Sequence, residues 1–139
     1  MFGKKKQSIE VTKLSSLVAD NMEVVGDVHF SDGLRVDGKV RGSVQCKEGS
    51  KSLLVLSEQG AIHGNVTAYD AVINGVIVGD VEVEHFLELQ PNARVSGNIS
   101  YRQLQMDAGA TVEGRLVLIG ETSSASNVVE LPSSAASNG

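Results

Sequence analysis

One short pattern of apolar and polar positions recurs six times between residues 18 and 118, and it reads apolar-x-Gly-x-apolar. The copies start at Val24, Val40, Ile62, Ile77, Val95 and Val112. Successive starts are therefore 16, 22, 15, 18 and 17 residues apart. A period of this length is typical of a solenoid, in which each repeat forms one turn, here called a coil, that stacks on the next.

Apolar residues also flank every copy at a constant offset. The positions six residues before and six residues after each start are all apolar or aromatic, although only 41% of the chain is hydrophobic. The preceding positions are Val18, Leu34, Leu56, Ala71, Leu89 and Met106, and the following ones are Phe30, Cys46, Ala68, Val83, Tyr101 and Leu118. An offset of six is about the length of one face, so three faces make a coil of about 18 residues. The predicted fold is all-β, a single-stranded parallel β-helix of about six three-sided coils.

Within each copy the apolar residues alternate with mostly polar ones. This period of two predicts one strand with a single buried face. The glycine then falls at an inward position, where the tube is narrow or the backbone bends. Successive valines and isoleucines of the six copies should stack on one another and form the core.

The repeat predicts one domain between two tails. We expect a β-helical domain over residues 18–119, a disordered arm over residues 1–17 and a disordered tail over residues 120–139, which is rich in Ser, Ala and Asn. Residues 47–52 lengthen one interval to 22 and are predicted to form a small loop that bulges from a corner.

Charge and cysteine content limit the possible partners. The net charge is −5, and residues 20–118 hold 8 basic and 14 acidic side chains, which argues against nucleic acid as the main partner. Cys46 is the only cysteine; we expect it to be buried and the compartment to be reducing. No apolar run approaches the roughly 18 residues of a transmembrane helix, and the start does not resemble a secretory signal. We therefore expect a cytoplasmic protein.

The first six residues suggest a membrane contact. Met1 and Phe2 would enter the lipid interface, while Lys4, Lys5 and Lys6 would meet anionic headgroups, each for about 1 kcal/mol. One such arm would bind marginally, but many arms on one assembly would bind firmly. The alternative is a solvated start with no partner.

The two ends of the predicted β-helix are candidate self-association surfaces. Soluble solenoids usually cover their end strands with a cap, and no strong amphipathic helix flanks this repeat. We predict that copies join end to end by strand addition. The candidate residues are Val18, Met22, Val24 and Val25 at the N-terminal end, and Val112, Leu116 and Leu118 at the C-terminal end. In the alternative, residues 8–17 and 121–131 fold over the ends as caps.

Catalytic chemistry has no support in the sequence. No nucleophile elbow, phosphate-binding loop or zinc-protease motif occurs, and His29, His63 and His85 fall at different positions of the repeat. We predict no catalytic residue, metal or cofactor. The alternatives are a discrete β-helical binding module and a hexapeptide-repeat acyltransferase, although the latter keeps a stricter six-residue period.

Residues 18–120 resemble the bactofilins, a family of bacterial polymer-forming cytoskeletal proteins. The resemblance rests on residues 34–44, 73–75 and 95–99, and the start Met-Phe-Gly-Lys-Lys-Lys is similar to the membrane-targeting peptide of many members. It implies a right-handed helix and non-polar filaments that form without nucleotide at the inner face of the cytoplasmic membrane. These filaments would scaffold cell-shape, cell-wall or polar-localisation factors. Some members need an aromatic residue in the last coil, where this chain has none near Val112.

Overall fold

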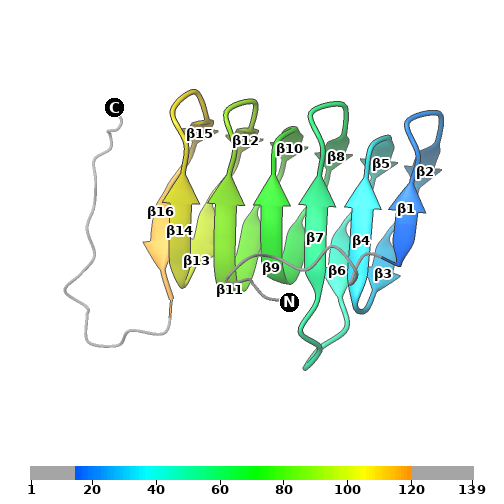
Figure 1. Cartoon of the computed structure of the whole chain (residues 1–139), viewed down its shortest axis with the longest axis horizontal. Helices are drawn as coiled ribbons and strands as arrows, with labels where there is room; N and C mark the ends of the chain where they lie inside the picture. Colours follow the sequence, from blue (N-terminus) through cyan, green and yellow to red (C-terminus); the bar gives the residue numbers. More distant parts are fainter. Residues whose placement is uncertain (1–14, 120–139) are drawn as a thin grey trace, which may run out of the picture.

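A computed structural model describes residues 15–119, and within them the chain is built from strands and turns without any helix. The strands form six coils of a parallel solenoid, with three faces in each coil (Figure 1). The first face comprises β1 (Ser16–Val18), β4 (Gly33–Val36), β7 (Leu53–Leu56), the second parts of β9 (Val66–Ile73) and β11 (Val81–Leu89), and β14 (Gln103–Met106).

The other two faces complete each coil. The second face comprises β2 (Glu23–Val25), β5 (Lys39–Arg41), β8 (Ala61–His63), β10 (Val76–Val78), β12 (Arg94–Ser96) and β15 (Thr111–Glu113). The third face comprises β3 (Val28–Phe30), β6 (Val44–Cys46), the first parts of β9 and β11, β13 (Ile99–Tyr101) and β16 (Leu116–Leu118). The predicted all-β parallel solenoid of about six coils is confirmed.

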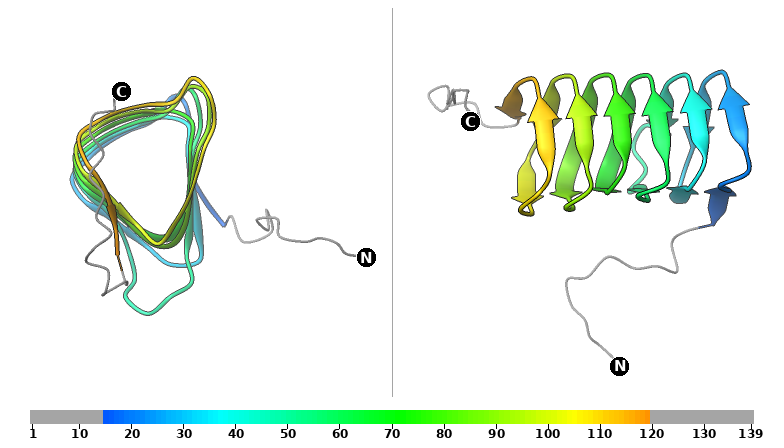
Figure 2. Two further views of the ribbon diagram at one scale, coloured as in Figure 1. Left: turned by 90° about the vertical axis from the view of Figure 1, so that its left-hand side faces the viewer. Right: turned by 90° about the horizontal axis from the view of Figure 1, so that it is seen from above.

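The solenoid is right-handed, as the family resemblance implied. In Figure 1 the chain rises along the first face, passes over the top and descends behind while it advances from right to left. Viewed along its axis, the tube has a three-sided outline (Figure 2, left).

Aliphatic side chains in register fill the tube. On the second face Val24, Val40, Ile62, Ile77, Val95 and Val112 stack in one column. On the third face Val28, Val44, Val66, Val81, Ile99 and Leu116 form another. Most members of both columns are buried, and burial of this apolar surface stabilises the coil. The stacking predicted from the repeat is therefore confirmed.

Each copy of the repeated phrase is two strands joined by a corner, and the prediction of one continuous strand is wrong. In the first copy Val24 points inward from β2, Gly26 and Asp27 form the corner, and Val28 begins β3. The corner contains two residues, so inward positions keep the even spacing that they would have in one strand. The alternation of apolar and polar residues therefore continues across the corner, and the sequence pattern does not show where the chain bends.

The glycines of the repeat lie at this corner because the coils approach each other most closely there. A Cβ atom added to Gly79 would meet the backbone carbonyl of Gly64 in the preceding coil, closer than real Cβ atoms come to an oxygen. The same conflict arises between Gly97 and Gly79 and at the other stacked corners. Gly79 also has a φ of 151°, a conformation that other residues rarely adopt. Close backbone stacking thus requires this glycine column.

The column that precedes each phrase is confirmed in part. Val18 pairs in register with Val36 rather than Leu34, and Leu56 pairs with Ile73 rather than Ala71. The reason is that corners between the first and second faces have two lengths: residues 37–38 and 74–75 make short corners, and the others contain four residues. The column that follows each phrase, from Phe30 to Leu118, keeps its predicted positions.

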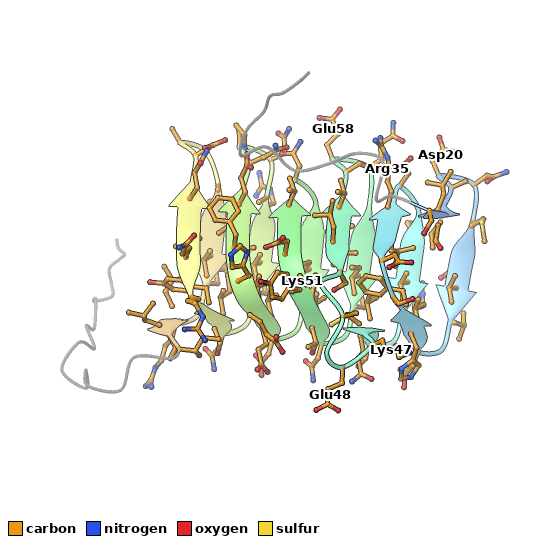
Figure 3. The ribbon with its side chains drawn as sticks, turned by 60° about the horizontal axis from the view of Figure 1, so that its bottom comes forward. Asp20, Arg35, Lys47, Glu48, Lys51 and Glu58 are labelled. Carbon is orange, nitrogen blue, oxygen red and sulfur yellow. The ribbon has the colours of Figure 1, made fainter. Side chains whose placement is uncertain are left out.

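The predicted insertion loop leaves the corner between β6 and β7, at the bottom of Figure 1. Lys47 and Glu48 project from it (Figure 3). At its end Ser52 is fully buried, and its hydroxyl accepts a hydrogen bond from the Tyr69 backbone N–H at 3.1 Å. Cys46, just before the loop, packs against the core but is only half-buried, so full burial was the wrong expectation.

Candidate functional site: the two end coils

Each end of the described solenoid exposes three strand edges. Within residues 15–119, β1, β2 and β3 pair only with the second coil, and β14, β15 and β16 pair only with the fifth. Figure 2 (right) shows these coils at opposite ends of the tube. An unpaired strand edge presents backbone donors and acceptors to any further strand that lies beside it.

The backbone pairing shows what the last coil offers. The Gly26 N–H donates to the Arg41 carbonyl of the next coil at 2.9 Å, and the Gly97 N–H donates to the Glu113 carbonyl at 3.0 Å. Gly114 occupies the same position in the last coil, and no further coil follows it within residues 15–119. The backbone groups of the last coil are therefore arranged like those that pair neighbouring coils within the tube.

Carboxylate and amide side chains line the corner beside the glycines. Asp27 Oδ1 accepts the Ser43 backbone N–H at 2.9 Å, and Asn65 Oδ1 accepts that of Asp80 at 3.0 Å. Asp80 and Asn98 continue the pattern, with Asn98 accepting the Arg115 N–H at 3.0 Å. These exposed side chains therefore tie successive coils together.

Replacement of Asn98 by alanine should loosen the last coil. Asn98→Ala removes the acceptor for the Arg115 N–H, and we expect the free energy of unfolding to fall by about 1 kcal/mol, the usual net worth of one hydrogen bond. Urea denaturation followed by circular dichroism measures it. Asn98→Asp keeps an acceptor oxygen and should leave stability close to that of the parent, so an equal loss in both variants would contradict this role.

At the C-terminal end, the predicted residues lie together and their inward side chains are partly open to solvent. Val112 in β15 and Leu116 in β16 are half-buried and pack against the core. Leu118 is 42% exposed. Met106 in β14 is 43% exposed beside them; it belongs to the apolar column that precedes each phrase, but the sequence prediction of the junction omitted it.

At the N-terminal end, the four predicted residues do not share one surface. Val18 in β1 is buried, Val24 in β2 is half-buried, and Met22 is exposed in the turn between them. Val25 is 78% exposed, because it points outward from the second face in register with Arg41. Only Val18, Met22 and Val24 therefore lie where an end-on neighbour would come close to the core.

The predicted membrane-contact residues Met1, Phe2, Lys4, Lys5 and Lys6 lie outside the described residues. Between residues 15 and 119, no helix is long and apolar enough to cross a membrane.

Side chains with catalytic or metal-binding chemistry are scattered over the surface. The described residues contain no group of three or more His, Cys, Asp or Glu side chains placed to hold a metal. His85 Nδ1 lies 2.8 Å from Asp70 Oδ1, and the His85 ring stacks on Tyr69 with centroids 4.8 Å apart. Asp70 begins the first face of the fourth coil, and His85 directly precedes the first face of the fifth. Their contact therefore also links neighbouring coils.

The stacked parallel strands define the class of protein as an all-β solenoid of six coils. The chain belongs to the bactofilin family: the family profile, described as polymer-forming cytoskeletal, matches residues 16–117. This is a structural family, and membership implies self-polymerisation.

Two curated relatives come from Myxococcus xanthus (strain DK1622). The chain is 24% identical to Bactofilin BacP over 102 residues, which is 73% of this chain and 41% of BacP. It is 21% identical to Bactofilin BacO over 102 residues, which is 73% of this chain and 78% of BacO. No solved structure gives a significant match.

Proposed function

We propose that this protein assembles end to end into non-polar filaments that need no nucleotide and lie at the inner face of the cytoplasmic membrane. The observation that carries the proposal is the open C-terminal coil, where core columns that are buried in the middle of the tube reach solvent at Met106 and Leu118. A second copy would bury these side chains and pair the strand edges beside them. Family membership supports polymer formation in general.

In this proposal the basic start of the chain attaches the filament to lipid. Lys4, Lys5 and Lys6 supply positive charge, and Met1 and Phe2 supply apolar side chains for the interface. A filament carries many such starts, so weak individual contacts add up to stable attachment. The attached polymer would serve as a scaffold for cell-shape, cell-wall or polar-localisation factors.

Electron microscopy of the purified full chain tests the filament proposal. We expect unbranched filaments in negative stain without added nucleotide. Six coils at about 4.8 Å each give about 30 Å per subunit, so the axial repeat of a non-polar filament, which contains two subunits, should be about 60 Å. A fixed small oligomer at every protein and salt concentration would instead favour a discrete binding module.

Deletion of residues 1–6 should separate lipid attachment from assembly. The shortened chain loses three lysines together with Met1 and Phe2, so we expect its co-sedimentation with anionic liposomes to fall to the level seen with neutral liposomes. Filaments should still form, because the end coils are unchanged. Full sedimentation of the shortened chain with anionic liposomes would refute the anchor.

A further inference from the structure

The outer side of the second face carries basic and apolar side chains without any acid in its four middle coils. Strands β5, β8, β10 and β12 each bury their middle residue and turn their first and third residues outward. Apart from a histidine and a serine, these outward residues are Lys39, Arg41, Ala61, Val76, Val78 and Arg94. They include three of the 8 basic side chains of residues 20–118 and none of the 14 acidic ones. We call the outward side of these four strands the basic face.

The other two faces of the same coils both present acids, Glu82 on the third face and Glu88 on the first. The acids at the borders of the basic face are engaged by the solenoid itself. Glu58 accepts a hydrogen bond from the Asn92 side-chain amide at 3.1 Å, and Asp80 accepts the Asn98 backbone N–H.

Two basic side chains of this face are free to bind a partner. Glu23, in the first coil, forms an ion pair with Arg41. Among residues 15–119, however, neither Lys39 nor Arg94 forms an ion pair, and both are exposed. Positive charge on an otherwise acidic body makes this face complementary to carboxylates.

The register of the strands fixes the distance between these two charges. Lys39, Ala61, Val76 and Arg94 follow one another in a single outward column, one residue per coil. Three strand spacings of about 4.8 Å place Lys39 and Arg94 about 14 Å apart along the tube axis. Ala61 and Val76 lie between them and are half-buried.

An extended peptide matches this column. Alternate residues of an extended chain point to the same side, and four residues span about 13 Å. Two carboxylates four positions apart would therefore reach Lys39 and Arg94 together, and the residue midway between them would face Ala61 and Val76. An apolar side chain suits that middle position because both of its neighbours are apolar.

The position of the face favours a protein partner over lipid. The chain enters β1 at the corner between the third and first faces, and the insertion loop leaves the same corner (Figure 2, left). In a three-sided tube this corner lies opposite the second face. Under the proposed function residues 1–6 bring that corner towards the membrane, so the basic face points away from the lipid.

We propose that the basic face binds an extended acidic segment of a partner protein, in which two carboxylate residues four positions apart enclose an apolar residue. The carboxylates pair with Lys39 and Arg94, and the apolar side chain packs on Ala61 and Val76. This inference rests on the proposed scaffold role and names the surface and the class of partner that it would use. Each subunit carries one such site, so a filament holds a partner with several acidic segments more firmly than a single subunit does.

Fluorescence anisotropy of a labelled peptide, Glu-Thr-Leu-Thr-Glu, titrated with the full chain at about 150 mM NaCl tests the site, because charges are screened beyond about 8 Å there. We expect Lys39→Glu/Arg94→Glu to bind this peptide at least about tenfold more weakly than the parent, since two exposed ion pairs become two repulsive contacts. A thermal melt like that of the parent confirms that the variant folds. If it does not fold, Lys39→Gln/Arg94→Gln avoids a like-charge contact with Glu23 and should still weaken binding at least about threefold.

Lys47→Glu/Lys51→Glu is the matched control. Both lysines are exposed on the insertion loop at the opposite corner, and their reversal changes the net charge by the same amount (Figure 3). This variant should bind the peptide within about twofold of the parent. A peptide of the same composition with adjacent carboxylates, Glu-Glu-Thr-Leu-Thr, should bind the parent at least about threefold more weakly, because it cannot reach both charges at once.

Four other results would separate the possibilities. Equal weakening in both glutamate variants would show a response to net charge and overturn the site. Release of the bound peptide by anionic liposomes would assign the basic face to lipid instead. Filaments that bind neither peptide would overturn this site alone, whereas a chain that binds the first peptide but never forms filaments would refute the proposed filament and support the site.

Discussion

Replacement of Gly79 by alanine should destabilise the solenoid by about 3 kcal/mol or more, among the largest effects expected of a single methyl group. The added Cβ would meet the carbonyl of Gly64 in the preceding coil, and the φ of 151° is itself unfavourable for alanine. Backbone rather than a flexible side chain blocks the space, so the two coils must separate locally and weaken the strand pairing beside them. Urea denaturation followed by circular dichroism measures the loss.

Gly26 provides a matched control for this prediction. It occupies the same corner in the first coil and has a φ of 129°, but nothing lies within 4 Å of an added Cβ atom, and no coil precedes it within residues 15–119. Gly26→Ala should therefore cost only the backbone strain, about 1–2 kcal/mol. Both variants need comparison at one protein concentration, since assembly raises apparent stability. Equal losses would show that backbone conformation, not coil stacking, requires the glycines.

The sequence predicted the coil count and the core because one periodicity governs both. Each coil must place aliphatic side chains over those of the coil before it, so Val24 and Val112 carry the same pattern five coils apart. The pattern could not reveal where strands end, since a corner of two residues at Gly26 and Asp27 preserves the even spacing of inward positions. Short and long corners, such as residues 37–38 and 57–60, differ by two residues, which likewise leaves the even spacing of inward positions unchanged.

The junction residues were predictable as apolar residues of the end coils but not as exposed ones. Val18 and Met106 occupy equivalent inward positions in the sequence, and only the structure shows that the first is covered and the second open. Val25 was assigned to the N-terminal end because it is apolar and early, yet its neighbour in register, Arg41, shows that this column faces solvent. Val25 occupies the outward x position of the repeated phrase, so the alternation itself places it on the solvent side, and its assignment to the end surface overlooked that pattern.

Replacement of Leu118 by arginine should abolish long filaments while leaving the fold intact. Leu118 is partly open to solvent in the last strand of the last coil, so arginine can direct its charged group away from the core of a single copy. In an end-to-end contact the same side chain would face a second apolar edge, and a buried charge without a partner costs several kcal/mol. Since every filament contact of this end would carry that cost, we expect filaments in negative stain to be replaced by particles no longer than two subunits.

Val78→Arg is the matched control for this junction. Val78 is 44% exposed, almost the same as Leu118, but it points outward from β10 in the middle of the tube. The two variants add the same charge to equally exposed valine or leucine positions and differ in their distance from an end. Filaments of normal length from Val78→Arg together with short particles from Leu118→Arg would locate the contact at the C-terminal coil. Short particles from both variants would point to a contact along the side of the tube, because only a lateral interface would bury Val78.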